Sequence, residues 1–123
     1  MRQNYLLPNI ERWTPDRGPV VRLADISVSY GEKKVIDHLS LDIPVGKTTV
    51  IIGESGSGKS SLIKAMNGLI VPDSGSSQLF GINTRDCSSS QIIELRKRTG
   101  TILQNYALID SISVFENIAF PLV

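Results

Sequence analysis

The residues best suited to chemistry lie in one run, Gly53-Glu54-Ser55-Gly56-Ser57-Gly58-Lys59-Ser60, which matches the phosphate-loop pattern G-x-x-x-x-G-K-[ST]. Glycines let the backbone turn so that successive N–H groups point into one concavity, where they can meet the charge of a triphosphate. Lys59 adds an ammonium that can reach the β- and γ-phosphates, and the Ser60 hydroxyl can ligate Mg²⁺. The pattern therefore predicts a nucleotide-binding loop that continues into Ser61.

The segments that flank this run should position it. Residues 48–52 are β-branched throughout, which is typical of a strand buried in a parallel sheet. Downstream, apolar residues from Leu62 to Leu69 recur at helical spacing, and Gly68 and Pro72 should end that helix. A glycine-rich linker is the alternative interpretation, and a buried strand and an amphipathic helix on its two sides disfavour it.

Composition limits the class of protein. The chain has 123 residues, 41% of them hydrophobic and 20% charged, as in a globular domain, and the net charge of +1 gives no reason to expect a nucleic-acid partner. Cys87 is the only cysteine, so no intrachain disulfide can form and a reducing compartment is expected. No apolar run reaches the roughly 18 residues that a membrane span requires.

The rest of the chain divides into an extension and a domain. Residues 1–19 contain three prolines and no periodicity, and we expect a loosely ordered tail, although Trp13 could attach it to the domain. Residues 20–123 should form the domain, with antiparallel strands at 20–30 and 33–43 and weaker strands at 78–80 and 101–103. Ser88 and Gln91 form a predicted capping box for a helix that ends near Arg98.

Two further residues narrow the interpretation. Tyr30 ends the first predicted strand, Gln104 follows the last, and the turn Pro72-Asp73-Ser74-Gly75 lies between the phosphate loop and Gln104. Each residue alone is weak evidence for nucleotide binding. A tyrosine at the end of a strand is usually a half-buried aromatic, and a glutamine after a strand is usually solvated. In this order and spacing, residues 21–123 resemble the nucleotide-binding subunits of ABC transporters.

The resemblance implies an α/β fold, a P-loop NTPase of ABC type with an antiparallel subdomain and the start of a parallel core sheet. It implies ATP and Mg²⁺ as cofactors, adenine stacked on Tyr30, Mg²⁺ held by Ser60 and Gln104, and catalytic roles for Lys59 and Gln104. The implied partners are membrane-spanning permease subunits and a second ATPase subunit, on the cytoplasmic face of the membrane. The residues expected to bind the nucleotide are Tyr30, Gly53, Glu54, Ser55, Gly56, Ser57, Gly58, Lys59, Ser60 and Ser61.

The segment after Gln104 resembles one subgroup. Residues 106–117 are similar to the ATPases of the Mla/Mce phospholipid-trafficking systems, whereas residues 116–122 are shared with importers of amino acids and with lipoprotein-release ATPases. Residues 105–123 contain no Lys or Arg and many apolar residues, so we expect an exposed apolar surface there. Ser77 replaces an aliphatic residue that the family usually has, which predicts a poorly formed strand, and Ser61 replaces the commoner Thr.

The residues that the family uses for hydrolysis after Gln104 are missing from the sequence. It contains no Leu-Ser-Gly-Gly-Gln and no aliphatic run ending in Asp-Glu; Asp110 comes too early for that role, and His38 precedes the phosphate loop. We therefore expect the N-terminal half of an ATPase domain, inactive by itself. A small-molecule kinase or GTPase and a non-catalytic nucleotide-binding remnant are the alternatives.

Overall fold

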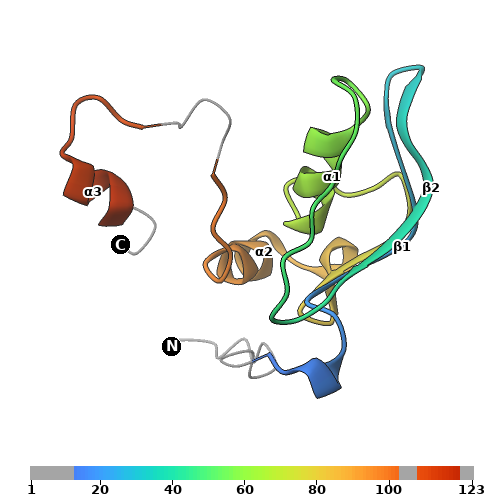
Figure 1. The fold of residues 1–123 in the computed structure, drawn as a ribbon, viewed down its shortest axis with the longest axis horizontal. Coiled ribbons are helices and arrows are strands. Elements are labelled where there is room, and N and C mark those ends of the chain that lie inside the picture. The colour runs from blue at the N-terminus through green and yellow to red at the C-terminus, as the bar shows by residue number, and fades with distance from the viewer. Residues whose placement is uncertain (1–12, 103–107, 120–123) are drawn as a thin grey trace.

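The computed structural model describes residues 13–102 and 108–119, which contain one antiparallel sheet (Figure 1). The strands are β1 (Val21–Tyr30), β2 (Lys33–Ile43), β3 (Ser74–Leu79) and β4 (Ile82–Asn83), in the order β2-β1-β3-β4. β1 pairs antiparallel with both β2 and β3. The sequence-based expectation of two antiparallel strands at 20–30 and 33–43 is confirmed.

The described residues also contain short helices; the first α-helix packs on one face of the sheet, and the last lies apart from it (Figure 1). They are η1 (Pro15–Arg17), α1 (Lys59–Met66), η2 (Thr84–Asp86), α2 (Ser89–Arg96) and α3 (Val114–Ala119). The predicted capping box of α2 is present, because the Ser88 side chain accepts from the Gln91 N–H and the Gln91 side chain accepts from the Ser88 N–H. At the other end of α2, the Arg96 guanidinium donates to the Gly68 carbonyl at 2.7 Å, which joins α2 to the turn after α1.

The core lies between α1 and the sheet. Leu23, Ile26 and Val28 of β1 are buried, and Leu62, Ala65 and Met66 cover them from α1. These three α1 residues share one helical face, as their spacing predicts. Val21 of β1, Ile36 of β2, Leu79 of β3 and Leu95 of α2 complete the core. This packing fixes where α1 begins, and so fixes the loop that precedes it.

The prediction of a buried strand at residues 48–52 is wrong for the described structure. These residues form no strand, and the Val50 and Ile52 side chains are 73% and 92% exposed. A parallel strand needs backbone partners on its edges and covering side chains on its faces. The single sheet of the described residues supplies neither, because β2 pairs there only with β1. Residues 101 and 102 likewise lie outside any strand, and residue 103 is outside the described residues.

The prediction that Ser77 weakens the third strand is also wrong. β3 forms over six residues, and Ser77 is 1% exposed within it. Its hydroxyl donates to the Ala65 carbonyl of α1 at 2.9 Å, and its carbonyl accepts from the Thr84 hydroxyl at 3.2 Å. A small polar side chain therefore suits this position, since it lets α1 approach the sheet and keeps its own polar atom paired.

Trp13 is attached to the domain, contrary to the expectation of a loose tail at this residue. Its indole N–H donates to the Gly18 carbonyl at 3.0 Å, and its ring packs edge-on against Phe80 with centroids 6.0 Å apart. The left-handed turn at Phe80 and Gly81 leaves room for this ring, because a side chain at Gly81 would collide with it. Residues 1–12 lie outside the described structure.

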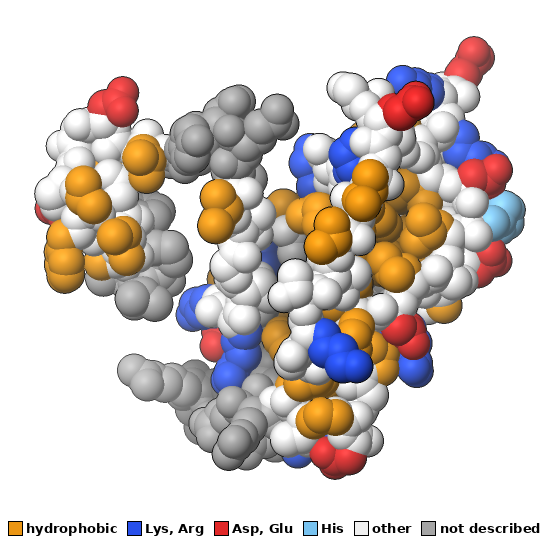
Figure 2. Space-filling model, in the orientation of Figure 1, with side chains coloured by type: hydrophobic (Ala, Val, Ile, Leu, Met, Phe, Trp, Pro, Cys, Tyr) orange, Lys and Arg blue, Asp and Glu red, His pale blue; other side chains and the backbone are white. Residues whose placement is uncertain are grey.

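The segment from residue 108 onward contains α3, which the sequence analysis did not predict. Ser113 and Glu116 cap it reciprocally: the Ser113 hydroxyl accepts from the Glu116 N–H at 3.2 Å, and the Glu116 carboxylate accepts from the Ser113 N–H at 2.8 Å and from its hydroxyl at 2.7 Å. These hydrogen bonds hold the pKa of Glu116 below its usual value. The expected apolar exposure is confirmed for the described part, since Leu108, Val114, Phe115 and Ile118 are exposed (Figure 2). No helix among the described residues combines the length and the apolar character needed to cross a bilayer.

Two glycines with left-handed backbones provide a test of the packing between β1 and β3. Gly31 (φ +60°) faces open space, whereas a side chain at Gly75 (φ +78°) would lie 2.5 Å from the Ala24 carbonyl oxygen and closer still to that of Asp25. We expect Gly31→Ala to lower the free energy of unfolding by about 1 kcal/mol, the cost of a side chain in this conformation. Gly75→Ala should lower it by about 3 kcal/mol or more, because backbone atoms must also move. Urea denaturation of both variants measures the difference, and equal losses would contradict the close approach.

Candidate nucleotide-binding site

The loop between residue 53 and α1 is shaped by glycines with left-handed backbone. Ser57 N–H donates to the Glu54 carbonyl at 3.1 Å, which closes a turn, and Gly56 within this turn has φ +78°. Gly58 has φ +100°, and a side chain there would lie 2.6 Å from the Val35 carbonyl oxygen of β2. Only glycine allows both this conformation and this approach. The loop is therefore seated directly against β2.

Helix α1 begins at Lys59 with its amino end open. Gly58 is the N-cap and supplies no side chain, so no cap side chain occupies the N–H groups of the first turn. The partial positive charge of a helix N-terminus also lies here. Together these features give the loop the donors and the field that bind an anion such as a phosphate group.

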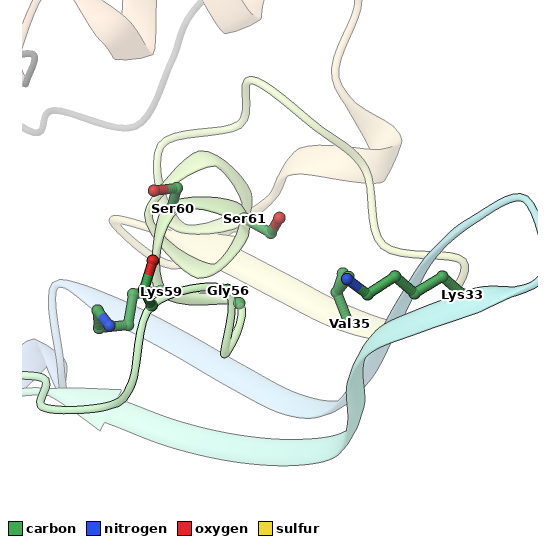
Figure 3. A pocket seen from close by; sticks show the side chains of 8 residues that line it. Lys33, Val35, Gly56, Lys59, Ser60 and Ser61 are labelled. Carbon is green, nitrogen blue, oxygen red and sulfur yellow. The ribbon is translucent and has the colours of Figure 1, made fainter. Parts of the chain in front are cut away.

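A cavity of about 490 Å³ lies between this helix end and β2 (Figure 3). Its walls are the loop, the first turn of α1 and the start of β2. Two of the eight residues that line it are lysines, and none is acidic. The eight lining residues are Lys33, Val35, Ser55, Gly56, Gly58, Lys59, Ser60 and Ser61.

The Lys59 ammonium is folded back onto the loop. It donates to the carbonyl oxygens of Gly53 and Glu54, the latter at 2.7 Å. In Figure 3 the side chain accordingly points away from Ser61 and Lys33. These carbonyls carry no net charge, so they attract the ammonium less strongly than the full negative charge of a phosphate does. Lys59 can therefore exchange them for a ligand by rotating its side chain.

Tyr30 is joined to the same helix turn from the far end of β1. Its hydroxyl and that of Ser61 share a hydrogen bond of 3.2 Å, while the side chain stays half exposed. Ser61 itself is buried in the first turn of α1. The contact therefore fixes the polar edge of the ring and leaves an aromatic face available for stacking beside the cavity.

The structure thus brings together most of the residues singled out in the sequence. Ser60 and Ser61 line one cavity with the glycine loop, and Tyr30 is hydrogen-bonded to Ser61. Gln104 lies outside the described residues, so its expected place near Ser60 stays a prediction. Sequence reasoning missed Lys33 and Val35, which line the cavity from β2. The available signal was the position of Lys33 opposite Tyr30 across the tight turn that joins the two predicted strands.

Comparison with known proteins identifies the same region. The protein family described as "ABC transporter" matches residues 36–121. A methionine import ATP-binding protein, MetN of Carboxydothermus hydrogenoformans, is 42% identical over 84% of this chain and 32% of its own length. An intermembrane phospholipid transport system ATP-binding protein, MlaF of Escherichia coli K12, is 38% identical over 84% of this chain and 38% of its own. The chain therefore spans about a third of the length of these relatives.

Solved structures give the same result for the fold. A dimeric ATP-binding cassette in a post-hydrolysis state, bound to ADP and Pi, superposes with a TM-score of 0.76 at 29% identity, over 83% of this chain and 46% of that one. Another dimeric structure, of a bacterial ABC transporter cassette, gives a TM-score of 0.77 at 28% identity over the same shares. These matches decide against the small-molecule kinase and GTPase alternatives.

The hydrogen bond between Tyr30 and Ser61 can be tested by a double-mutant cycle. Tyr30→Phe and Ser61→Ala each remove one hydroxyl, and the double variant removes both. We expect a coupling of about 0.5–1.5 kcal/mol in the free energy of unfolding, the usual net value of such a bond. Strictly additive effects of the two substitutions in urea denaturation would show that the hydroxyls do not interact.

Proposed function

Because this chain belongs to the ABC transporter family, we propose that it is the nucleotide-binding part of an ATPase subunit and binds Mg-ATP at residues 53–61. One observation carries the proposal. The open amino end of α1 and its glycine loop line a cavity that has no acidic side chain in its wall, and Tyr30 is hydrogen-bonded to Ser61 of that wall. An ATP molecule carries about four negative charges when fully ionised, and this cavity offers donors and cations without opposing charge.

Each part of the nucleotide has a partner in this arrangement. Adenine would stack on the exposed face of Tyr30, and the loop N–H groups would bind the phosphate chain. Lys59 would leave the Gly53 and Glu54 carbonyls for the terminal phosphates. The contact between Tyr30 and Ser61 holds the base-binding and phosphate-binding parts at a fixed separation.

In the described part of the site, the Ser60 hydroxyl on the cavity wall is the group suited to ligate a magnesium ion. Mg²⁺ prefers oxygen ligands and retains several waters, so one hydroxyl together with phosphate oxygens is a suitable set. When bound, the ion neutralises phosphate charge. Gln104 is proposed as the second protein ligand and as a residue that orients the attacking water, through its neutral amide.

We propose that ATP hydrolysis in the complete assembly is coupled to transport across or between membranes. Relatives named for methionine import and for intermembrane phospholipid transport are similar to this chain over the same share of it. Phospholipid is the preferred cargo, since residues 106–117 resemble that subgroup, and an amino acid is the second candidate. Membrane-spanning permease subunits and a second ATPase subunit would complete the assembly on the cytoplasmic face of the membrane.

Hydrolysis requires groups beyond those described. The 123 residues contain no aliphatic run ending in Asp-Glu and no Leu-Ser-Gly-Gly-Gln. Phosphoryl transfer depends on a positioned nucleophile and on charge stabilisation from all sides of the phosphate. We therefore propose that these residues alone bind ATP without turning it over, so that by themselves they act as a non-catalytic nucleotide-binding unit.

Binding of ATP is tested with a pair of lysine variants from the same helix. Lys59→Ala should weaken Mg-ATP binding by about 10- to 100-fold, since a charge-assisted contact contributes roughly 1.5–3 kcal/mol. Lys64→Ala removes an equal charge from the exposed side of α1, away from the cavity, and should change affinity less than about 2-fold. Isothermal titration calorimetry gives both values. Equal affinity of the wild type and Lys59→Ala would refute nucleotide binding at this loop.

The proposed absence of ATP hydrolysis is tested by measuring phosphate release. Phosphate release from ATP by the purified 123-residue chain should not exceed that of its Lys59→Ala variant, because the sequence has no aliphatic run ending in Asp-Glu to supply the general base. A colorimetric phosphate assay over several hours compares them at equal concentration. Steady release by the wild type, abolished in the variant, would overturn the proposed inactivity and leave the proposed ATP binding intact.

A further inference from the structure

Two neighbouring lysines at the start of β2 have different surroundings. Successive side chains of a strand point to opposite faces, so Lys33 and Lys34 cannot share one environment. The Lys34 ammonium forms an ion pair with Asp37 at 3.0 Å. Lys33 instead lines the cavity together with Ser60 and Ser61. In Figure 3 its side chain extends from β2 over Val35, on the side that faces α1.

The charge of Lys33 is not neutralised by the protein. No salt bridge or hydrogen bond involves its ammonium within residues 13–102 and 108–119. No Asp or Glu is among the residues that line the cavity. The other lysine of the cavity, Lys59, already donates to two loop carbonyls. Lys33 is therefore the cation of this cavity that has no partner in the described structure.

The place of Lys33 along the site follows from the sheet register. Lys33 is paired with Tyr30 across the turn between β1 and β2, and Tyr30 is bonded to Ser61. Lys33 is thus at the Tyr30 end of the site, whereas Gly53 and Lys59 are at the loop end. A nucleotide with its base on Tyr30 and its terminal phosphates in the loop would bring its first phosphate to this end.

We propose that Lys33 is a nucleotide-binding residue, whose ammonium contacts the phosphate nearest the ribose. The inference rests on the proposed function, because it assigns a further residue to the same site. A contact with the first phosphate acts on ATP and ADP alike, since both carry that group. Lys33 would thereby anchor the nucleotide before and after loss of the terminal phosphate, while Lys59 serves the terminal end.

The experiment compares Lys33→Met with Lys34→Met by calorimetric titration with Mg-ATP and with Mg-ADP. Methionine keeps the length and the apolar stem of the side chain and removes only the charge. Lys33→Met should lower the affinity for both nucleotides by the same factor, about 3- to 10-fold, as expected for a partly solvated charge pair. Lys34→Met should change either affinity less than about 2-fold. Lys33→Arg keeps the positive charge and should retain most of the wild-type affinity for both nucleotides. A purely structural role of the lysine stem would not predict this difference between the arginine and methionine variants.

The outcomes separate this inference from the proposed function. If Lys33→Met binds both nucleotides as the wild type does while Lys59→Ala does not, the role of Lys33 is refuted and ATP binding stands. Equal losses in Lys33→Met and Lys34→Met would also refute it, since they would show a general effect of surface charge. A loss for ATP alone would place Lys33 at the terminal phosphate and contradict the assignment. If the wild type binds neither nucleotide, both proposals fail.

Discussion

The close approach of the Gly58 backbone to the Val35 carbonyl of β2 is the contact on which the candidate site depends. It fixes where the glycine loop ends and α1 begins, relative to the sheet. The core strengthens this placement, because Leu62, Ala65 and Met66 of α1 pack on β1 residues. A side chain at residue 58 would have to displace backbone rather than a flexible side chain. The loop is therefore positioned by packing and by conformational restriction, before any ligand is considered.

The charges of the site are arranged for a ligand that is itself charged. The two lysines of the cavity come from different elements, Lys33 from β2 and Lys59 from α1, and neither is paired with a carboxylate in the described residues. Lys59 rests on backbone carbonyls, which keep it near the loop at little cost of rearrangement. The Tyr30–Ser61 hydrogen bond ties the aromatic ring to the helix. An anion with an attached flat ring suits this combination better than a free anion does, because the aromatic ring is bonded to the wall of the cavity that the glycine loop lines.

Two groups of exposed apolar residues stand out among the described residues. Val50 and Ile52 are exposed in the unpaired segment that follows β2. Leu108, Val114, Phe115 and Ile118 are exposed around α3. In the first group, β-branched residues have strand character without the backbone partners that a strand requires. This explains how a segment of such composition can remain outside the sheet of the described residues.

The sequence alone determined the local features. The phosphate loop, the helix that follows it, the two long strands and the capping box of α2 depend on residue types at short spacing, which carry their own physical signal. The tertiary structure decided what depends on distant partners. Residues 48–52 have the composition of a buried strand, yet pairing is a property of neighbours. Ser77 looked unfavourable until α1 supplied the Ala65 carbonyl, and Trp13 looked loose until Phe80 supplied a ring. Lys33 became a site residue only because the turn after Tyr30 brings the start of β2 beside the first turn of α1.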